Sequence, residues 1–372
     1  MNSAIESSSK NPKTYHKIKY RLFFINLFVN LLFLFLLSVS GISTAWYYLA
    51  LSISDHFLLI NGIYTVLFCL TMYLVNFGFH FFEGFILEHR FGLSNQTFGK
   101  WLKDNLKGSL ISFVVTIVAI EAAYLFLKNY PTTWWIWAGF FWLFLTLVMA
   151  RITPTMIIPL FYKYSNIKNE ELEKGILNLF EKCRLKIKDI YMVDFSAKTK
   201  KANAFVCGFG KSRRVVLSDN LVNQFSVPEI ETVVAHEIGH YKNHDIIRLT
   251  AVNSTVTFLS FFLLDVFLKK MLTLGNITHI YDIAFFPIIV IGLSVFSLIT
   301  MPILNGYSRF IERNADIFCL EMTQRPKDFI SMIDKLGKMN LAEFEPHPLI
   351  EKFFYNHPSI AKRIKLAQEF KG

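Results

Sequence analysis

V-V-A-H-E-I-G-H-Y-K-N-H-D, residues 233–245, carries the strongest signal in this sequence. Positions four apart on an α-helix lie about 40° apart around the axis and roughly 6 Å apart along it, so His236 and His240 share one face. H-E-x-x-H on a helix is typical of sites where two histidines bind Zn²⁺ and the glutamate, here Glu237, is the general base. Zn²⁺ can lower the pKa of water to about 7, so the pattern predicts hydrolytic chemistry.

The pattern also occurs by chance, and the alternative is a solvated helix that happens to carry these residues. Small residues beside the histidines favour the functional interpretation. Ala235 and Gly239 permit close approach of another segment. Glycine costs about 1 kcal/mol inside a helix, which indicates a packing or functional reason for its presence.

Composition indicates a membrane protein. The chain has 372 residues, of which 53% are hydrophobic and 16% aromatic, including 39 phenylalanines. A soluble domain rarely has so much apolar surface to bury. The net charge is +11, but no isolated basic face with interleaved aromatic residues is apparent, so we expect no nucleic-acid partner. The four cysteines are scattered, which predicts neither a disulfide framework nor a zinc knuckle.

Six apolar stretches are long enough to cross about 30 Å of hydrocarbon as helices. They cover residues 22–50, 57–87, 109–128, 134–160, 246–268 and 283–304. Lysine and arginine alternate between the loops, and basic loops stay on the cytoplasmic side. The sequence therefore predicts an integral, multi-pass membrane protein whose two termini and H-E-x-x-H helix are cytoplasmic.

These spans divide the chain into two regions. Residues 1–164 form an N-terminal membrane region with four transmembrane helices, and residues 165–372 form a zinc peptidase domain interrupted by the last two spans. The pattern is mainly α-helical. Residues 204–207 and 214–217 are predicted to form a small β-hairpin across the turn 208–213.

A catalytic zinc generally has three protein ligands, so the two histidines need a companion. One large protease class uses a histidine six residues after the second one, but Ile246 occupies that position here. His244 lies about 12 Å along the helix from His236, too far to share the ion unless the helix breaks. We expect His244 to be a neighbouring residue and not a ligand.

The better candidate for the third ligand follows the sixth span. Glu312 and Asp316 share a helix face, so Glu312 is placed to ligate zinc while Asp316 contacts the outer nitrogen of a ligand histidine. The alternative is a solvated charged face that also carries Arg309 and Arg313. The residues alone leave both alternatives open.

Several motifs together resemble one family, the integral-membrane zinc metalloproteases called type I CAAX prenyl endopeptidases. The matching stretches are residues 86–97, A-N-A-F-V-C-G-F (202–209), H-E-I-G-H (236–240), E-R-N-A-D (312–316) and N-H-P-S-I-A-K-R (356–363). The resemblance implies a membrane helical barrel that encloses a water-filled chamber, with a zincin-like metalloprotease domain at its cytoplasmic end. Family members have seven spans, and the first of them has no counterpart among the six expected here.

The resemblance also implies residue roles. His236, His240 and Glu312 would bind one Zn²⁺, Glu237 would be the base, and Asp316 would support a ligand. Asn203 and Ala204 would lie on an edge strand that pairs with the substrate backbone. His357, with Arg363 nearby, would position the substrate and stabilise the oxyanion.

The leading hypothesis is a membrane-embedded zinc metalloendopeptidase that acts, by resemblance, in CAAX-type C-terminal processing of prenylated peptides. Its expected partners are a peptide or protein substrate and membrane lipid. A second hypothesis is a membrane-protein quality-control protease. A third, from a different class, is a non-catalytic membrane scaffold with a structural zinc. The short N-terminus favours a bacterial inner membrane over the endoplasmic reticulum.

Overall fold

The computed structural model describes residues 11–208, 213–275 and 277–371. Six helices in this part of the chain are long and apolar enough to span a membrane, as the sequence predicts. They are Pro12–Val39, Phe57–Arg90, Phe98–Asn129, Trp134–Phe161, Asp245–Thr273 and Ile283–Thr323. The first ends earlier than expected, because the chain breaks at Ser40 and Gly41. Gly41 has a φ of 80°, and a short apolar helix, α3 (Ile42–Ile53), follows it.

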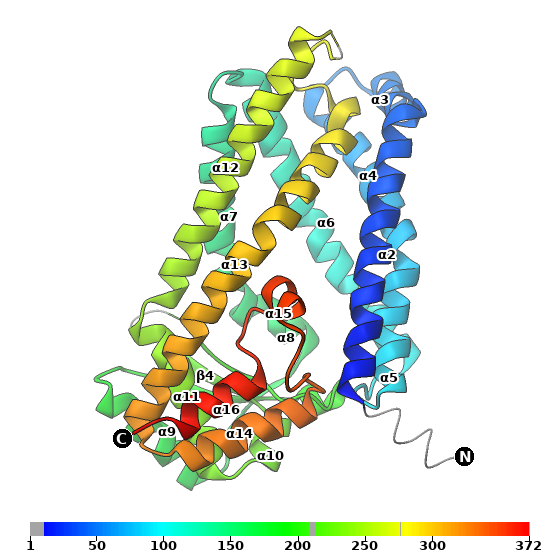
Figure 1. Cartoon of the computed structure of the whole chain (residues 1–372). Helices are drawn as coiled ribbons and strands as arrows, with labels where there is room; N and C mark the ends of the chain where they lie inside the picture. The colour runs from blue at the N-terminus through cyan, green and yellow to red at the C-terminus, as the bar shows by residue number, and fades with distance from the viewer. Residues whose placement is uncertain (1–10, 209–212, 276, 372) are drawn as a thin grey trace.

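The long helices stand beside one another and carry a small polar domain at one end (Figure 1). Their regular parts are α2 (Pro12–Val39), α4 (Phe57–Phe81), α6 (Phe98–Asn129), α7 (Trp134–Ile152), α12 (Asp245–Thr273) and α13 (Phe286–Thr323). Short π-helical segments continue α4 into α5 (Glu88–Arg90) and α7 into α8 (Ile158–Phe161). The fold is mainly α-helical, as the sequence pattern predicts, and is the membrane barrel that the family resemblance implies.

The polar domain is built around α11 (Val227–Lys242), which carries the H-E-x-x-H motif. The domain also contains the shorter helices α9 (Glu170–Lys182), α10 (Asp219–Gln224), α14 (Pro326–Met339), α15 (Pro348–Phe354) and α16 (Ile360–Gln368). Of these, α9 and α14 pack against α11. One apolar core joins α9, α11, α13 and α14, with Phe180, Val234 and Phe329 almost fully buried in it. Burial of these side chains fixes the orientation of α11, and therefore of its histidines.

A four-stranded sheet lies beside this core in the order β1-β2-β4-β3. The predicted hairpin is confirmed as β3 (Ala204–Cys207) and β4 (Arg214–Ser218), which pair antiparallel; residues 209–212 of its turn lie outside the described part. Two further strands, β1 (Tyr164–Asn166) and β2 (Asp189–Val193), complete the sheet. Because β3 is the last strand of the order, one of its edges is open.

Two of the differences from the predicted helix boundaries bear on the site. The sixth span does not end near residue 304, because α13 continues through Pro302 to Thr323 and carries Glu312 on the same helix. The motif helix α11 ends at Lys242, and His244 has a φ of 55°. The helix therefore breaks at His244, and α12 starts in a new direction at Asp245.

Candidate active site

Close packing of α11 against α13 builds the centre of the site. Ser226 and Glu229 form a capping box that starts α11, with the Ser226 N–H donating to Oε2 of Glu229 at 2.8 Å. A side chain at Gly239 would meet the backbone of Ala315 at 3.2 Å. Gly239 therefore permits the close contact between the two helices, which is the packing reason that the sequence suggested.

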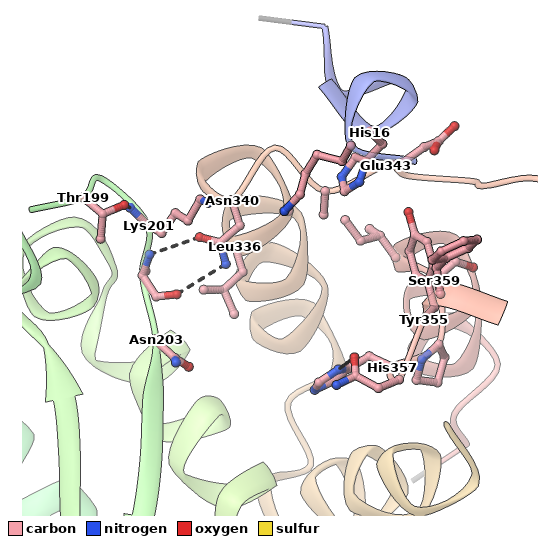
Figure 2. Close-up of a pocket in the computed structure, with 18 of the residues that line it drawn as sticks. His16, Thr199, Lys201, Asn203, Leu336, Asn340, Glu343, Tyr355, His357 and Ser359 are labelled. Carbon is pink, nitrogen blue, oxygen red and sulfur yellow. Dashed lines mark hydrogen bonds between the residues drawn. The ribbon is translucent and has the colours of Figure 1, made fainter. Parts of the chain in front are cut away.

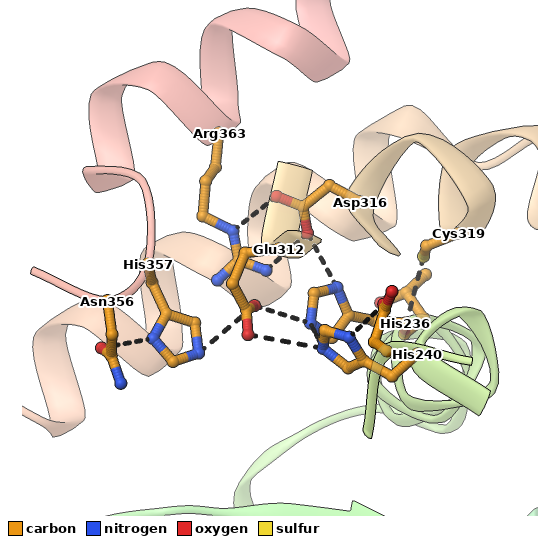
Figure 3. Close-up of polar contacts among 10 residues, drawn as sticks. His236, His240, Glu312, Asp316, Cys319, Asn356, His357 and Arg363 are labelled. Atoms are coloured by element: carbon orange, nitrogen blue, oxygen red, sulfur yellow. Dashed lines mark hydrogen bonds and ion pairs between the residues drawn. The ribbon is translucent and has the colours of Figure 1, made fainter. Parts of the chain in front are cut away.

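His236, His240 and Glu312 converge on one point (Figure 3). Nε2 of His236 lies 3.2 Å from Oε2 of Glu312, and Nε2 of His240 lies 3.5 Å from Oε1. The two Nε2 atoms are 3.2 Å apart. Each of the three residues offers one ligand atom, and these atoms all lie within 4.8 Å of one another. Glu312 is only 8% exposed, so the solvated charged face is excluded.

The donor set fits a metal ion. Oε2 of Glu312 is buried and accepts no well-aligned hydrogen bond from the described residues, although the Nε2 atoms of His236 and His357 lie 3.2 and 3.3 Å away. A buried carboxylate oxygen without a donor is costly, and a cation held between it and two imidazoles would remove that cost. Two histidines and one carboxylate with an open fourth position are typical of catalytic metal sites.

Two aspartates orient the histidines through their outer nitrogens. Nδ1 of His236 lies 2.8 Å from Oδ1 of Asp316, the contact that the sequence predicts. Nδ1 of His240 lies 3.0 Å from Oδ2 of Asp245. Both contacts leave Nε2 free to bind a metal. Asp245 was not anticipated, because it reaches His240 only through the helix break at His244.

Arg363 reaches the site through Asp316 (Figure 3). Its Nε and one terminal nitrogen donate to the two carboxylate oxygens of Asp316 at 2.8 and 2.6 Å. Such a bidentate pair fixes the carboxylate strongly. Arg363 also lines the cavity next to the site. In this structure its contacts are to a supporting carboxylate, so its expected contact with substrate stays a prediction.

A cavity of about 1090 Å³ opens from the convergence point and extends along α2 and α4. Glu237 and His357 line it near the metal ligands, and Asn203 and Ala204 line it from the sheet. Glu237 is not one of the converging ligands. Burial raises the pKa of the Glu237 carboxyl, as expected for a group that exchanges protons near neutral pH.

His357 approaches from the other side of the ligand carboxylate. Its Nε2 lies 3.3 Å from Oε2 of Glu312, and about half of the side chain is exposed to the cavity. Arg309, one turn before Glu312, donates to the backbone carbonyl oxygens of Glu351 and Tyr355 at 2.8 and 2.5 Å. Arg309 therefore fastens the loop that carries His357 to the helix that carries Glu312.

The metal affinity of the site is expected to depend on pH, because a ligand histidine must lose its proton before it binds a metal. Burial disfavours the charged form of His236, but the carboxylates of Asp316 and Glu312 outweigh it and raise the pKa of His236 to about 9. Without metal, this imidazole holds a proton at pH 7 that metal binding must displace. We expect the apparent affinity to weaken by roughly tenfold for each unit that the pH falls below about 9. Metal titrations from pH 6 to 8.5 measure this slope, and a flat profile would contradict it.

Comparison with known proteins agrees with this architecture. The model of peptidase family M48 matches residues 166–371, and that of the CAAX prenyl protease N-terminal region, with five membrane helices, matches residues 5–163. A Bacillus subtilis protein described as the uncharacterized metalloprotease YhfN is 29% identical over 95% of this chain and 84% of its own length.

Eukaryotic relatives and one solved structure extend the likeness. An Arabidopsis thaliana CAAX prenyl protease 1 homolog is 31% identical over 77% of this chain and 68% of its own length. CAAX prenyl protease 1 of Saccharomyces cerevisiae is 29% identical over 78% of this chain and 68% of its own length. The crystal structure of S. mikatae Ste24p matches all of this chain and 90% of its own with a TM-score of 0.86 at 21% identity, which shows a shared fold.

The helical membrane barrel and the three converging ligands define an integral-membrane metalloprotease. The chain belongs to peptidase family M48.

Proposed function

We propose that this chain is a zinc-dependent endopeptidase that cuts near the C-terminus of prenylated, CAAX-type peptides. The observation that carries the proposal is the convergence of His236, His240 and Glu312, beside Glu237, at the end of a large cavity lined partly by membrane helices. Two imidazoles, one carboxylate and an open position favour zinc. The names of the plant and yeast relatives support the substrate class.

The cavity supports a substrate that carries an apolar group. Its wall along α2 and α4 includes Leu22, Phe23, Leu27 and Phe79. These side chains offer an apolar surface that is continuous with the site, as a lipid chain attached to a peptide would require. A quality-control protease for unmodified membrane proteins would cut without such a group. Comparing lipidated and unmodified peptides distinguishes this alternative from the proposed function.

In the proposed mechanism, His236, His240 and Glu312 would hold zinc, which would supply Lewis-acid polarisation of water and of the scissile carbonyl. Glu237 accepts a proton from the attacking water and passes it to the leaving amine nitrogen as the carbon–nitrogen bond breaks. His357, with Arg363 behind it, faces the oxygen on which negative charge develops. Ala204 holds the extended peptide by backbone pairing at the open edge of the strand, and Asn203 lines the cavity beside it. Asp316 keeps His236 oriented throughout.

We further propose that the site faces the cytoplasm of a bacterial cell, in its inner membrane. The distribution of lysine and arginine among the loops supports that orientation. The B. subtilis relative, which matches 95% of this chain, supports the bacterial assignment. The division into a membrane region (1–164) and a peptidase domain (165–372) is supported by the limits of the two family models.

The test is cleavage of paired peptides by the purified protein in detergent or vesicles. We expect hydrolysis of a farnesylated CAAX peptide, loss of turnover with a chelator, and recovery with added Zn²⁺. The unmodified peptide of the same sequence is expected to react much more slowly, because it leaves the apolar wall of the cavity unfilled. Equal turnover of both peptides would favour the quality-control alternative, and turnover that withstands metal removal would reject the metalloprotease mechanism.

A further inference from the structure

The open edge of β3 can be followed residue by residue. The backbone of Asn203 faces β4, since the Ser218 N–H donates to the Asn203 carbonyl at 2.9 Å. The carbonyl of Lys201 also faces inward and accepts from Nδ2 of Asn220 at 2.9 Å. Backbone groups alternate in direction along an extended strand. The N–H and C=O groups of residues 202, 204 and 206 therefore point to the open side, where a substrate strand would pair.

Asn340 already occupies the first of these positions (Figure 2). Its Oδ1 accepts from the Ala202 N–H at 3.1 Å, and its Nδ2 donates to the Ala202 carbonyl at 3.3 Å. One side-chain amide thus makes the two hydrogen bonds that a residue of a paired strand would make. At Ala204 and beyond, no hydrogen bond from another described segment occupies the open edge. The Ala204 N–H donates to Oδ1 of its neighbour Asn203, at 2.9 Å.

The turn that presents Asn340 is held firmly in place. Asn340 ends α14, and Leu341 after it has a φ of 50°, a conformation that a bulky residue adopts only when its surroundings enforce it. The Ala342 N–H donates to the Gly337 carbonyl at 2.8 Å, and the Leu341 carbonyl lies 3.0 Å from Nε2 of His16 on α2. Leu341 itself packs against Tyr15, Leu87, Phe91 and Leu93.

The direction of a bound peptide follows from strand pairing. Antiparallel pairs are about two to three times as common as parallel ones and slightly more stable per residue. A peptide antiparallel to β3 runs from Cys207 towards Ala202, so its C-terminal side meets Asn340. From Ala204, only about two residues of edge remain before that point.

We propose that Asn340 ends the substrate-binding edge at Ala202 and thereby limits how many residues a substrate has on the C-terminal side of the cleaved bond. Asn340 is then a specificity-determining residue that favours a short C-terminal leaving peptide. The inference rests on the proposed function, because it takes β3 as the strand that binds substrate.

The experiment compares two farnesylated peptides that share the cleaved sequence and differ in having three or nine residues after the cleaved bond. Product masses identify the bond that is cut. We expect the wild-type protein to prefer the short peptide in kcat/KM by at least tenfold. Asn340→Ala frees the Ala202 backbone, and the preference is expected to fall by at least tenfold. Asn129→Ala is the control, since Asn129 bonds only to the Leu125 carbonyl within α6 and is exposed.

The ratio between peptides separates specificity from stability. Loss of the helix end alone would lower turnover of both peptides and the melting temperature, and would leave the ratio unchanged. Asn340→Ser is the second variant if Asn340→Ala does not fold. An unchanged ratio in a folded variant, or no length preference in the wild type, overturns the role of Asn340. Failure of the wild type to cut either peptide overturns the proposed function instead.

Discussion

Glu237→Gln is expected to lower kcat for peptide hydrolysis by about 10²- to 10⁴-fold, the usual contribution of a general acid–base group. Glutamine keeps the shape of the side chain but cannot accept the proton. The bound metal is expected to remain, because Glu237 lies outside the group of converging ligands. Steady-state kinetics and elemental analysis of the same preparation measure the two effects.

Glu231→Gln is the matched control for that experiment. Glu231 lies on the same helix, but its carboxylate pairs with Arg325 away from the cavity. Activity of this control close to that of the wild type would show that loss of a glutamate from α11 is harmless in itself. Turnover by Glu237→Gln within a few fold of the wild type, in a preparation free of wild-type protein, would reject the assignment of the base. The scaffold hypothesis predicts that Glu237→Gln changes neither metal content nor activity, since a structural metal needs no carboxylate beside it.

Glu312→Ala is expected to remove the metal itself. Loss of outer partners of metal ligands costs about 10- to 100-fold in affinity, and loss of a ligand should cost more. We therefore expect metal content to fall from about one ion per chain to near zero after dialysis, with activity falling in parallel. Inductively coupled plasma analysis of the purified variant measures this loss.

The control for Glu312→Ala is Glu321→Ala, because Glu321 is an exposed glutamate further along α13. It should retain the metal. Full metal occupancy in Glu312→Ala would mean that another residue completes the ligand set. Loss in both variants would indicate a general defect of α13, so the assignment of Glu312 depends on the difference between them.

The sequence predicts the geometry of the converging residues where the spacing between them is short. His236 and His240 are fixed by one helical turn, and Glu312 and Asp316 by another. Each pair therefore carries its geometry in its spacing. The resemblance to a known family supplied what spacing cannot, namely that these two turns meet although a pair of membrane spans separates them. The structure places their ligand atoms within 4.8 Å of one another.

Other features depend on backbone geometry that no local pattern encodes. The contact of Asp245 with His240 exists only because His244 adopts a positive φ and breaks the helix there. Asn340 reaches Ala202 across a separation of 138 residues, so its role as a substitute strand partner has no signal in the sequence. The helix break after Val39 could not be predicted for another reason. Apolar residues continue on both sides of Ser40 and Gly41, so hydropathy alone predicts one continuous span.

Because α13 is continuous from the membrane span to Glu312, the surrounding lipid can influence the geometry of the metal site. A helix of 38 residues is roughly 57 Å long, so each degree of change in its inclination displaces its far end by roughly 1 Å. Metal–ligand distances tolerate only about 0.2 Å. Bilayer thickness influences the inclination of spanning helices. Catalytic constants measured in thin and thick bilayers, or in detergent micelles, therefore describe differently adjusted metal centres and should not be pooled.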